Sequence, residues 1–153
     1  MRRGSGVGRA ALLSLAAASY LSAQPAPIQT QETNQTGIVA DLVECKRSEG
    51  VLSIKVRFRN TGDAKVSVPV IKGRNYDDYY VTAGGKKFFV LRDTEKVPLA
   101  APSDGFGNLS ANLEKGQGTL WWAKYPAPPA EVRKVSYFTP LGPPFEDVPI
   151  TDK

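Results

Sequence analysis

Strict alternation of apolar and polar residues from Val51 to Asn60 is the feature that most constrains the fold. Successive side chains of an extended strand point to opposite faces, so one face of this segment is apolar and the other is polar. The apolar side chains are Leu52, Ile54, Val56 and Phe58, and the polar ones are Ser53, Lys55, Arg57 and Arg59. The pattern predicts an antiparallel strand with one buried face and one solvated face.

Further short apolar runs, separated by turn residues, predict an all-β chain. The runs span 38–46, 65–71, 77–83, 86–93, 119–125, 132–139 and 145–150, with a short edge strand possible at 97–101 and a loop expected across the rest of 94–111. No amphipathic segment has the length and caps of a helix. About seven short strands in this arrangement predict an immunoglobulin-like antiparallel β-sandwich over residues 37–153.

Gly84-Gly85 predicts the two-residue loop of a β-hairpin, because both positions tolerate positive φ. This loop fixes the register of the flanking strands: Tyr79 faces Val90, Tyr80 faces Phe89, Val81 faces Phe88 and Asp77 meets Arg92. Apolar or aromatic pairs therefore occur on both faces. The hairpin is either buried on two sides or exposes an aromatic patch.

The first 23 residues have the composition of a cleavable export signal. Arg2, Arg3 and Arg9 supply positive charge, residues 10–21 form a short apolar stretch, and Ser22-Ala23 is a plausible cleavage site. We therefore expect a soluble periplasmic or extracellular protein without a membrane span. Gln24 follows the expected cut, so we expect no lipid anchor. Residues 24–36 are rich in Gln, Thr and Pro, and we expect them to form a flexible leader.

Removal of this signal changes the charge of the chain. Three of the 20 basic residues and none of the 15 acidic ones lie within it, so the net charge falls from +5 to +2. The longest basic run in the remainder is the pair Lys86-Lys87. We therefore expect no binding to nucleic acid.

The residue types that most catalytic sites need are missing from the sequence. It contains no His, one Cys and one Met, the last being Met1. These counts exclude His-based triads, His-containing or Cys₄ zinc sites and Met/His copper sites, and we expect no metal or cofactor. Asp77 and Asp78 are adjacent, so in a strand they point apart and form no acid/base pair. We therefore expect a non-enzymatic protein, with a carboxylate-based hydrolase as the less favoured reading.

Cys45 alternates with Val39 and Val43 along an apolar face, which favours a buried thiol in the core. Its alternative is an intermolecular disulfide, because a single cysteine cannot form an intramolecular one.

Five aromatic residues form the candidate binding surface: Trp121, Trp122, Tyr76, Tyr79 and Tyr80. Neighbours in a strand point to opposite faces, so one tryptophan is expected in the core and the other on the outside. The outer one either packs beneath the proline-rich segment that begins at Pro126 or forms an exposed surface that stacks on a sugar or receives a partner's side chain.

Three segments carry a resemblance to a known family. They are V-R-F-R-N-T-G-D at 56–63, L-E-K-G-Q-G-T-L-W-W-A-K-Y-P at 113–126 and K-V-S-Y-F at 134–138. The chain contains these segments in the same order as the small exported bacterial immunoglobulin-like domains grouped with the mycobacterial immunoprotective extracellular antigen. It resembles those domains over roughly residues 38–150. The resemblance implies the fold and export, and it brings no catalytic signature.

The favoured hypothesis is an exported, non-enzymatic interaction module of the bacterial envelope or exterior that binds a protein through a sheet face or edge. The alternative is a carbohydrate-binding module that uses exposed Trp or Tyr side chains. The fold alone does not decide between these two hypotheses.

Overall fold

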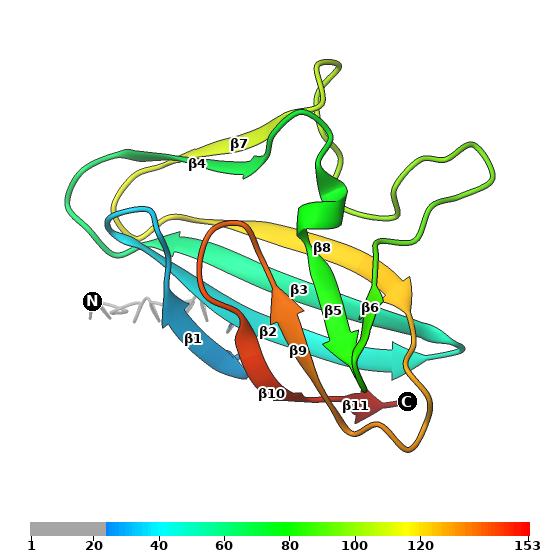
Figure 1. The fold of residues 1–153 in the computed structure, drawn as a ribbon. Helices are drawn as coiled ribbons and strands as arrows, with labels where there is room; N and C mark the ends of the chain where they lie inside the picture. Colours follow the sequence, from blue (N-terminus) through cyan, green and yellow to red (C-terminus); the bar gives the residue numbers. More distant parts are fainter. Residues whose placement is uncertain (1–23) are drawn as a thin grey trace, which may run out of the picture.

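The computed structural model describes residues 24–153; the predicted export signal, residues 1–23, lies outside the described part. Eleven strands and one 3₁₀ turn, η1 (Tyr76–Asp78), make up the fold, which confirms the all-β prediction with more strands than expected (Figure 1). The strands are β1 (Gln29–Glu32), β2 (Ile38–Ser48), β3 (Val51–Asn60), β4 (Val66–Ile71), β5 (Tyr80–Ala83), β6 (Lys86–Phe88), β7 (Leu109–Leu113), β8 (Gly118–Pro126), β9 (Lys134–Phe138), β10 (Phe145–Pro149) and β11 (Thr151–Asp152). Within residues 24–153, no helix has the length and apolar character needed to cross a membrane.

The first sheet has the order β1-β2-β3-β8, and β11 pairs in parallel with β2. β3 occupies the residues that the alternation predicted, and its four apolar side chains are fully buried. Its polar side chains lie on the outer face, where Lys55 is opposite Trp122 of β8. The alternation therefore predicted both the strand and its buried face.

The second sheet has the order β10-β9-β5-β6. Its β5–β6 hairpin has the predicted register, with Val81 opposite Phe88, and Arg92 Nη2 lies 3.4 Å from Asp77 Oδ1. The paired strands are shorter than predicted for two reasons: η1 replaces the extended chain before Tyr79, and the chain beyond Phe88 leaves β5 and bonds to β8, where the Leu91 N–H donates to the carbonyl of Lys124.

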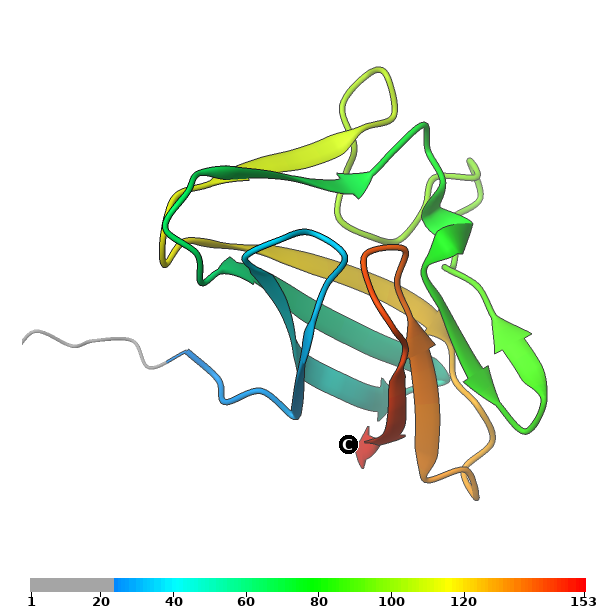
Figure 2. The same ribbon diagram turned by 60° about the vertical axis from the view of Figure 1, so that its left-hand side comes forward.

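The two sheets pack face to face as an immunoglobulin-like sandwich (Figures 1 and 2). In immunoglobulin domains, strand B neighbours strand E in one sheet, and strand F lies between strands C and G in the other. The same relations hold here: β3 neighbours β8, and β9 lies between β5 and β10. The core between the sheets contains apolar side chains from both.

A separate two-stranded sheet, β4–β7, lies above β8 in both views (Figures 1 and 2). Residues 109–111 were expected in a loop but form the first part of β7. They pair with β4, and the register shifts between Pro69 and Ile71. Pro69 has no N–H to donate, so an irregular edge pair accommodates it. Residues 97–101 form no named strand; they make one isolated bridge with β8, at Ala100–Ala123, and another with Arg92, at Pro98.

The prediction of a flexible leader over residues 24–36 is wrong for its second half. Residues 29–32 form β1, which pairs with β2 from Gln29–Leu42 to Glu32–Val39. The Thr30 hydroxyl donates to Asp41 Oδ1 at 2.7 Å, and the Gln29 amide donates to the carbonyl of Glu146 at 2.8 Å. One polar partner from the neighbouring strand and one from β10 hold this strand, and its own composition gives no sign of them.

Candidate functional site

The five predicted aromatics do not form one surface. Trp121 and Tyr79 are fully buried and Tyr76 is 4% exposed, so the prediction of a binding surface is wrong for these three. Trp122 and Tyr80 are half-buried. Because each is a strand neighbour of a core residue, Trp122 lies on the outer face of the first sheet and Tyr80 on the outer face of the second. The two side chains therefore lie on opposite sides of the sandwich and cannot form one surface.

The buried aromatics form a hydrogen-bonded network in the core. Trp121 stacks on Tyr79 with ring centroids 4.1 Å apart, and its indole N–H donates to the Tyr137 hydroxyl at 2.8 Å. The hydroxyls of Tyr125 and Tyr137 lie 2.9 Å apart. Burial raises the pKa of Tyr79, Tyr125 and Tyr137 well above the ordinary value, so these phenols are neutral in the folded protein. The network supports the core and has no open face.

Cys45 is a core residue with 1% of its surface exposed. Burial raises the pKa of its thiol to about 12. The thiolate is the reactive form of cysteine, so this side chain is chemically inert in the folded state.

Two carboxylates of the first sheet, Asp41 and Asp152, are engaged in ion pairs. Asp41 is fully buried and lies 3.1 Å from Arg57 Nη2 and 3.0 Å from Arg59 Nε. Asp152 pairs with Arg47 and Arg133. Among residues 24–153, no group of three or more Asp, Glu, Cys or His side chains could hold a metal ion. These carboxylates are accounted for by their cationic partners.

A different aromatic residue, Phe106, is the most exposed large apolar side chain among residues 24–153, at 86%. It lies in the loop 103–108, which projects above the sandwich in Figure 1. An exposed phenyl ring loses the free energy of burial, about 2 kcal/mol, and gains nothing within the molecule. At this exposure the ring is available for contact with another molecule.

The loop that carries Phe106 is fixed by hydrogen bonds. Asp104 Oδ1 accepts from the backbone N–H of Phe106 at 2.9 Å and from that of Asn108 at 2.8 Å. Arg74 donates from its backbone N–H to the carbonyl of Gly107 at 2.8 Å and from its guanidinium to the carbonyl of Gly105 at 2.9 Å. The phenyl ring is therefore held away from the surface by a structured turn.

Gly107 is required for this arrangement. Its φ of +85° is in the region that favours glycine, and a Cβ at this position would lie 2.2 Å from Arg74 Cγ. The contact between the loop and Arg74 depends on the absence of that side chain.

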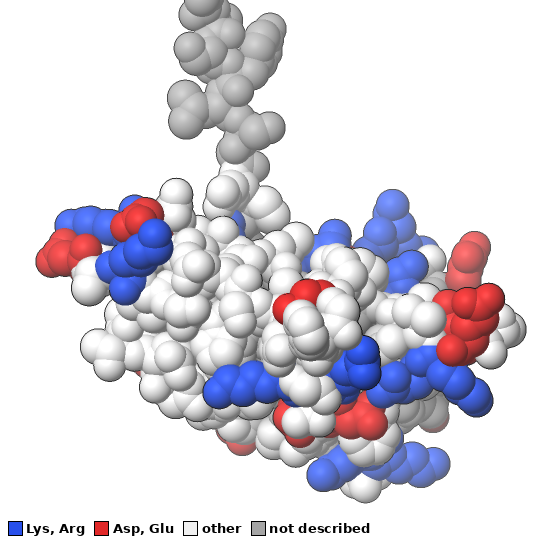
Figure 3. All heavy atoms as spheres, turned by 90° about the horizontal axis from the view of Figure 1, so that it is seen from above, with Lys and Arg blue, Asp and Glu red and all other residues white. Residues whose placement is uncertain are grey.

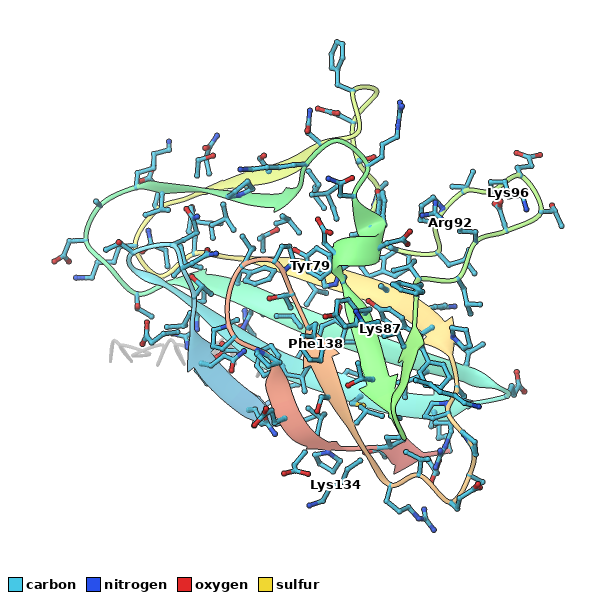
Figure 4. All side chains as sticks on the ribbon, in the orientation of Figure 1. Tyr79, Lys87, Arg92, Lys96, Lys134 and Phe138 are labelled. Atoms are coloured by element: carbon cyan, nitrogen blue, oxygen red, sulfur yellow. The ribbon has the colours of Figure 1, made fainter. Side chains whose placement is uncertain are left out.

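Beside this loop lies a groove of about 440 Å³. Its walls combine cationic and apolar side chains, including Arg74, Arg92, Lys96, Val97, Pro98 and Pro102. Figure 4 labels Arg92 and Lys96, which extend from the neighbouring loop. We call Phe106, Arg74 and this groove the loop-end site.

The opposite end of the β4–β7 sheet contains charges that neutralise one another. Figure 3, seen from above, shows acidic and basic side chains clustered there. Lys65 pairs with Glu114 at 3.0 Å, and Lys115 pairs with Asp63 at 2.5 Å. The charges at this end are therefore paired with one another in solvent-exposed turns.

The hairpin of the second sheet exposes the aromatic patch that was one of its two predicted outcomes. Tyr80 stacks on Phe138 with centroids 4.6 Å apart and planes at 9°, and Phe89 lies 6.1 Å from Tyr80. The ammonium group of Lys87 lies 4.5 Å from the centre of the Tyr80 ring. Phe138 comes from β9 on one side of β5, and Lys87 comes from β6 on the other side (Figure 4).

Phe106 was not predicted as a site residue, because strand patterns indicate only aromatic residues that lie within strands. The sequence S-D-G-F-G-N at 103–108 does contain a signal: a phenylalanine between two glycines, outside any strand pattern, has no apolar face to join. Comparisons with protein-family models, curated proteins and solved structures find no match for this chain.

Proposed function

We propose that the protein is an exported, non-catalytic module that binds another protein through the loop-end site. The observation that supports this most strongly is the exposed Phe106 ring on a hydrogen-bonded loop. The proposal of export is supported by the basic and apolar residues of 1–23.

The loop-end site has the composition of a protein-binding hot spot. Such hot spots are enriched in aromatic and arginine side chains that enter a desolvated pocket of the partner. Phe106 would supply the aromatic side chain, and Arg74 lies directly against its loop. The loop is already ordered, so binding loses little conformational entropy.

The partner proposed here has an apolar pocket for one phenyl ring, with carboxylates at its rim. Those carboxylates would face the guanidinium groups of Arg74 and Arg92. Immunoglobulin-like domains commonly present their recognition loops at one end of the sandwich, which agrees with this placement.

The test is site-specific photo-crosslinking in the native envelope. The tagged full chain would carry a photoreactive phenylalanine analogue at position 106 or, as a control, at Leu120, which is 47% exposed on the first sheet. We expect a discrete crosslinked protein from position 106 and none from position 120. When the tagged chain is recovered by affinity without a crosslinker, the same protein should be absent with Phe106→Ser and present with Leu120→Ser. Equal crosslinking from both positions would contradict the proposal.

Export is tested separately on the same cells. The protein recovered from the periplasm or the medium should begin at Gln24 by N-terminal sequencing. Recovery of the chain with its first 23 residues intact, and only from the cytoplasm, would remove this part of the proposal.

A further inference from the structure

A second surface, independent of the loop-end site, lies on the outer face of the β10-β9-β5-β6 sheet. A groove of about 370 Å³ lies there near the Gly84-Gly85 turn. Its polar lining includes Lys86, Lys87, Lys134, Thr82 and Ser136. We call it the lysine groove.

The β-sheet arranges the central residues of the lysine groove in a row. Thr82 of β5 is directly opposite Lys87 of β6 on one side and Ser136 of β9 on the other. Neighbouring strands are about 4.8 Å apart, so this row extends about 10 Å across three strands. Lys134 precedes Ser136 by two residues and shares its face, and Figure 4 shows it at the lower end of β9.

The positive charge of the groove is not neutralised within the described residues. No ion pair found among residues 24–153 includes Lys86, Lys87 or Lys134. Asp147 is the one carboxylate among the residues that line the groove. Three ammonium groups and one carboxylate give the groove an excess of positive charge, which attracts anions.

One of the three ammonium groups is held in place before any ligand binds. Lys87 Nζ lies over the Tyr80 ring, and Tyr80 is stacked in turn on Phe138. A cation–π contact of this kind contributes about 0.5–1 kcal/mol at an exposed site. The lysine therefore loses less freedom on binding than an unsupported one.

The remaining polar groups indicate the class of anion. The hydroxyls of Thr82 and Ser136 can each donate and accept a hydrogen bond, which suits the hydroxyls of a sugar chain. The groove lies on a sheet face beside the edge strand β6. An extended acidic peptide that paired with this edge through backbone hydrogen bonds would lie beyond β6 and would not cross the row of Thr82 and Ser136. We propose that the lysine groove binds an acidic polysaccharide, with its carboxylate or sulfate groups on the lysines and its hydroxyls on Thr82 and Ser136.

Tyr80 has a supporting role in this proposal. Its ring contacts Phe138 from one neighbouring strand and Lys87 from the other, so it positions the ammonium group and is not a free stacking surface. Recognition is therefore expected to depend on charge and on hydrogen bonds more than on sugar–aromatic stacking.

The test measures binding of the purified exported chain to polygalacturonate, dextran sulfate, neutral dextran and polyglutamate by isothermal titration at low salt. The double substitution Lys87→Glu/Lys134→Glu changes the groove. Its control is Lys72→Glu/Lys124→Glu, which changes the net charge equally at exposed lysines outside the groove. Circular dichroism would establish that all variants are folded.

We expect binding to polygalacturonate, to dextran sulfate or to both, and weaker binding at high salt. The groove variant should bind at least about tenfold more weakly, and the control variant should change less than about threefold. Preference for polygalacturonate or for dextran sulfate identifies carboxylate or sulfate as the recognised group. Phe106→Ser should leave this binding unchanged, which distinguishes the result from failure of the loop-end proposal.

Three outcomes would overturn the proposal. The first is that the protein binds neither polygalacturonate nor dextran sulfate. The second is that it binds polyglutamate as tightly as it binds the acidic polysaccharides. The third is that the control variant loses as much binding as the groove variant. The second of these would assign the groove to acidic peptides.

Discussion

Replacement of Asp41 by Asn is the perturbation that most sharply tests the buried ion-pair cluster on the outer face of the first sheet. The Asp41 carboxylate is fully buried and accepts hydrogen bonds from the Thr30 hydroxyl of β1 and from Arg57 and Arg59 of β3. The substitution keeps the shape of the side chain and removes its charge. It leaves two guanidinium groups facing a neutral amide.

The expected loss of stability follows from this geometry. Removing one partner of a buried ion pair typically costs about 3–5 kcal/mol. The arginine side chains are 17% and 36% exposed, so water takes up part of their charge. We therefore expect the free energy of unfolding to fall by about 2–3 kcal/mol at neutral pH.

The effect should depend on pH. Burial alone would raise the pKa of Asp41, but hydrogen bonds from Arg59, Thr30 and Arg57 together hold it below its ordinary value of 3.8. The folded state then binds fewer protons than the unfolded state, so the stabilisation is present above that value. It is lost as the pH falls through the lower pKa of the folded state. The difference between wild type and Asp41→Asn should therefore shrink in acid.

Urea unfolding, followed by tryptophan fluorescence at about pH 7 and about pH 2.5, measures this difference. Asp147→Asn is the control, because that carboxylate is exposed and takes part in none of the ion pairs described above. Amide exchange in residues 29–32 should also become faster in Asp41→Asn, because Thr30 loses a charged acceptor. An equal loss of stability at both pH values would refute the assignment of the effect to the carboxylate charge.

Three further predictions concern the core. Arg47→Met should lower stability by about 2–4 kcal/mol and speed amide exchange in residues 127–133. The reason is that the buried guanidinium donates to four carbonyls of that segment and to Asp152; unchanged exchange there would contradict this role. Trp121→Phe should cost about 2–3 kcal/mol in urea unfolding, since the Tyr137 hydroxyl loses its indole donor and a void remains. Trp122→Phe should cost less, and the reverse order would mean that the two faces of β8 are misassigned. Cys45 should resist alkylation at about pH 8 in the native protein and react fully after unfolding, because burial raises its pKa to about 12; rapid native alkylation, or a disulfide-linked dimer, would contradict the core assignment.

Much of the central sandwich could be predicted from local patterns in the sequence. The alternation along β3 predicted its bounds and its buried face, and Gly84-Gly85 predicted the register that pairs Val81 with Phe88. Both signals are local, because they depend on the period of two in a strand and on the φ angles of a tight turn.

The edges of the fold could not be predicted in this way. β1 is held by Asp41 of the strand beside it and by the carbonyl of Glu146, which is 117 residues away in the sequence. The polar composition of β1 itself gives no sign of either contact. η1 interrupts the alternation before β5, and Tyr76 consequently turns into the core. A period of two cannot describe a segment that is not extended.

The candidate site was predicted only in part. Adjacent tryptophans in a strand predicted that one would be buried, but the choice of Trp121 depends on its stack with Tyr79 from the other sheet. Tyr80 was correctly expected on a possible aromatic patch. Phe106 was missed because strand patterns give no information about a side chain that its loop holds outside the fold.

The central claim is that Phe106 is the main contact with a protein partner, and the most direct test is the dissociation constant of the partner identified by crosslinking. Titration calorimetry would compare wild type, Phe106→Ser and the control Leu120→Ser at equal ionic strength. A hot-spot aromatic contributes about 2 kcal/mol or more, so Phe106→Ser should weaken binding about 30-fold. Leu120→Ser should leave the dissociation constant unchanged. Equal affinity of the wild type and Phe106→Ser would contradict the account.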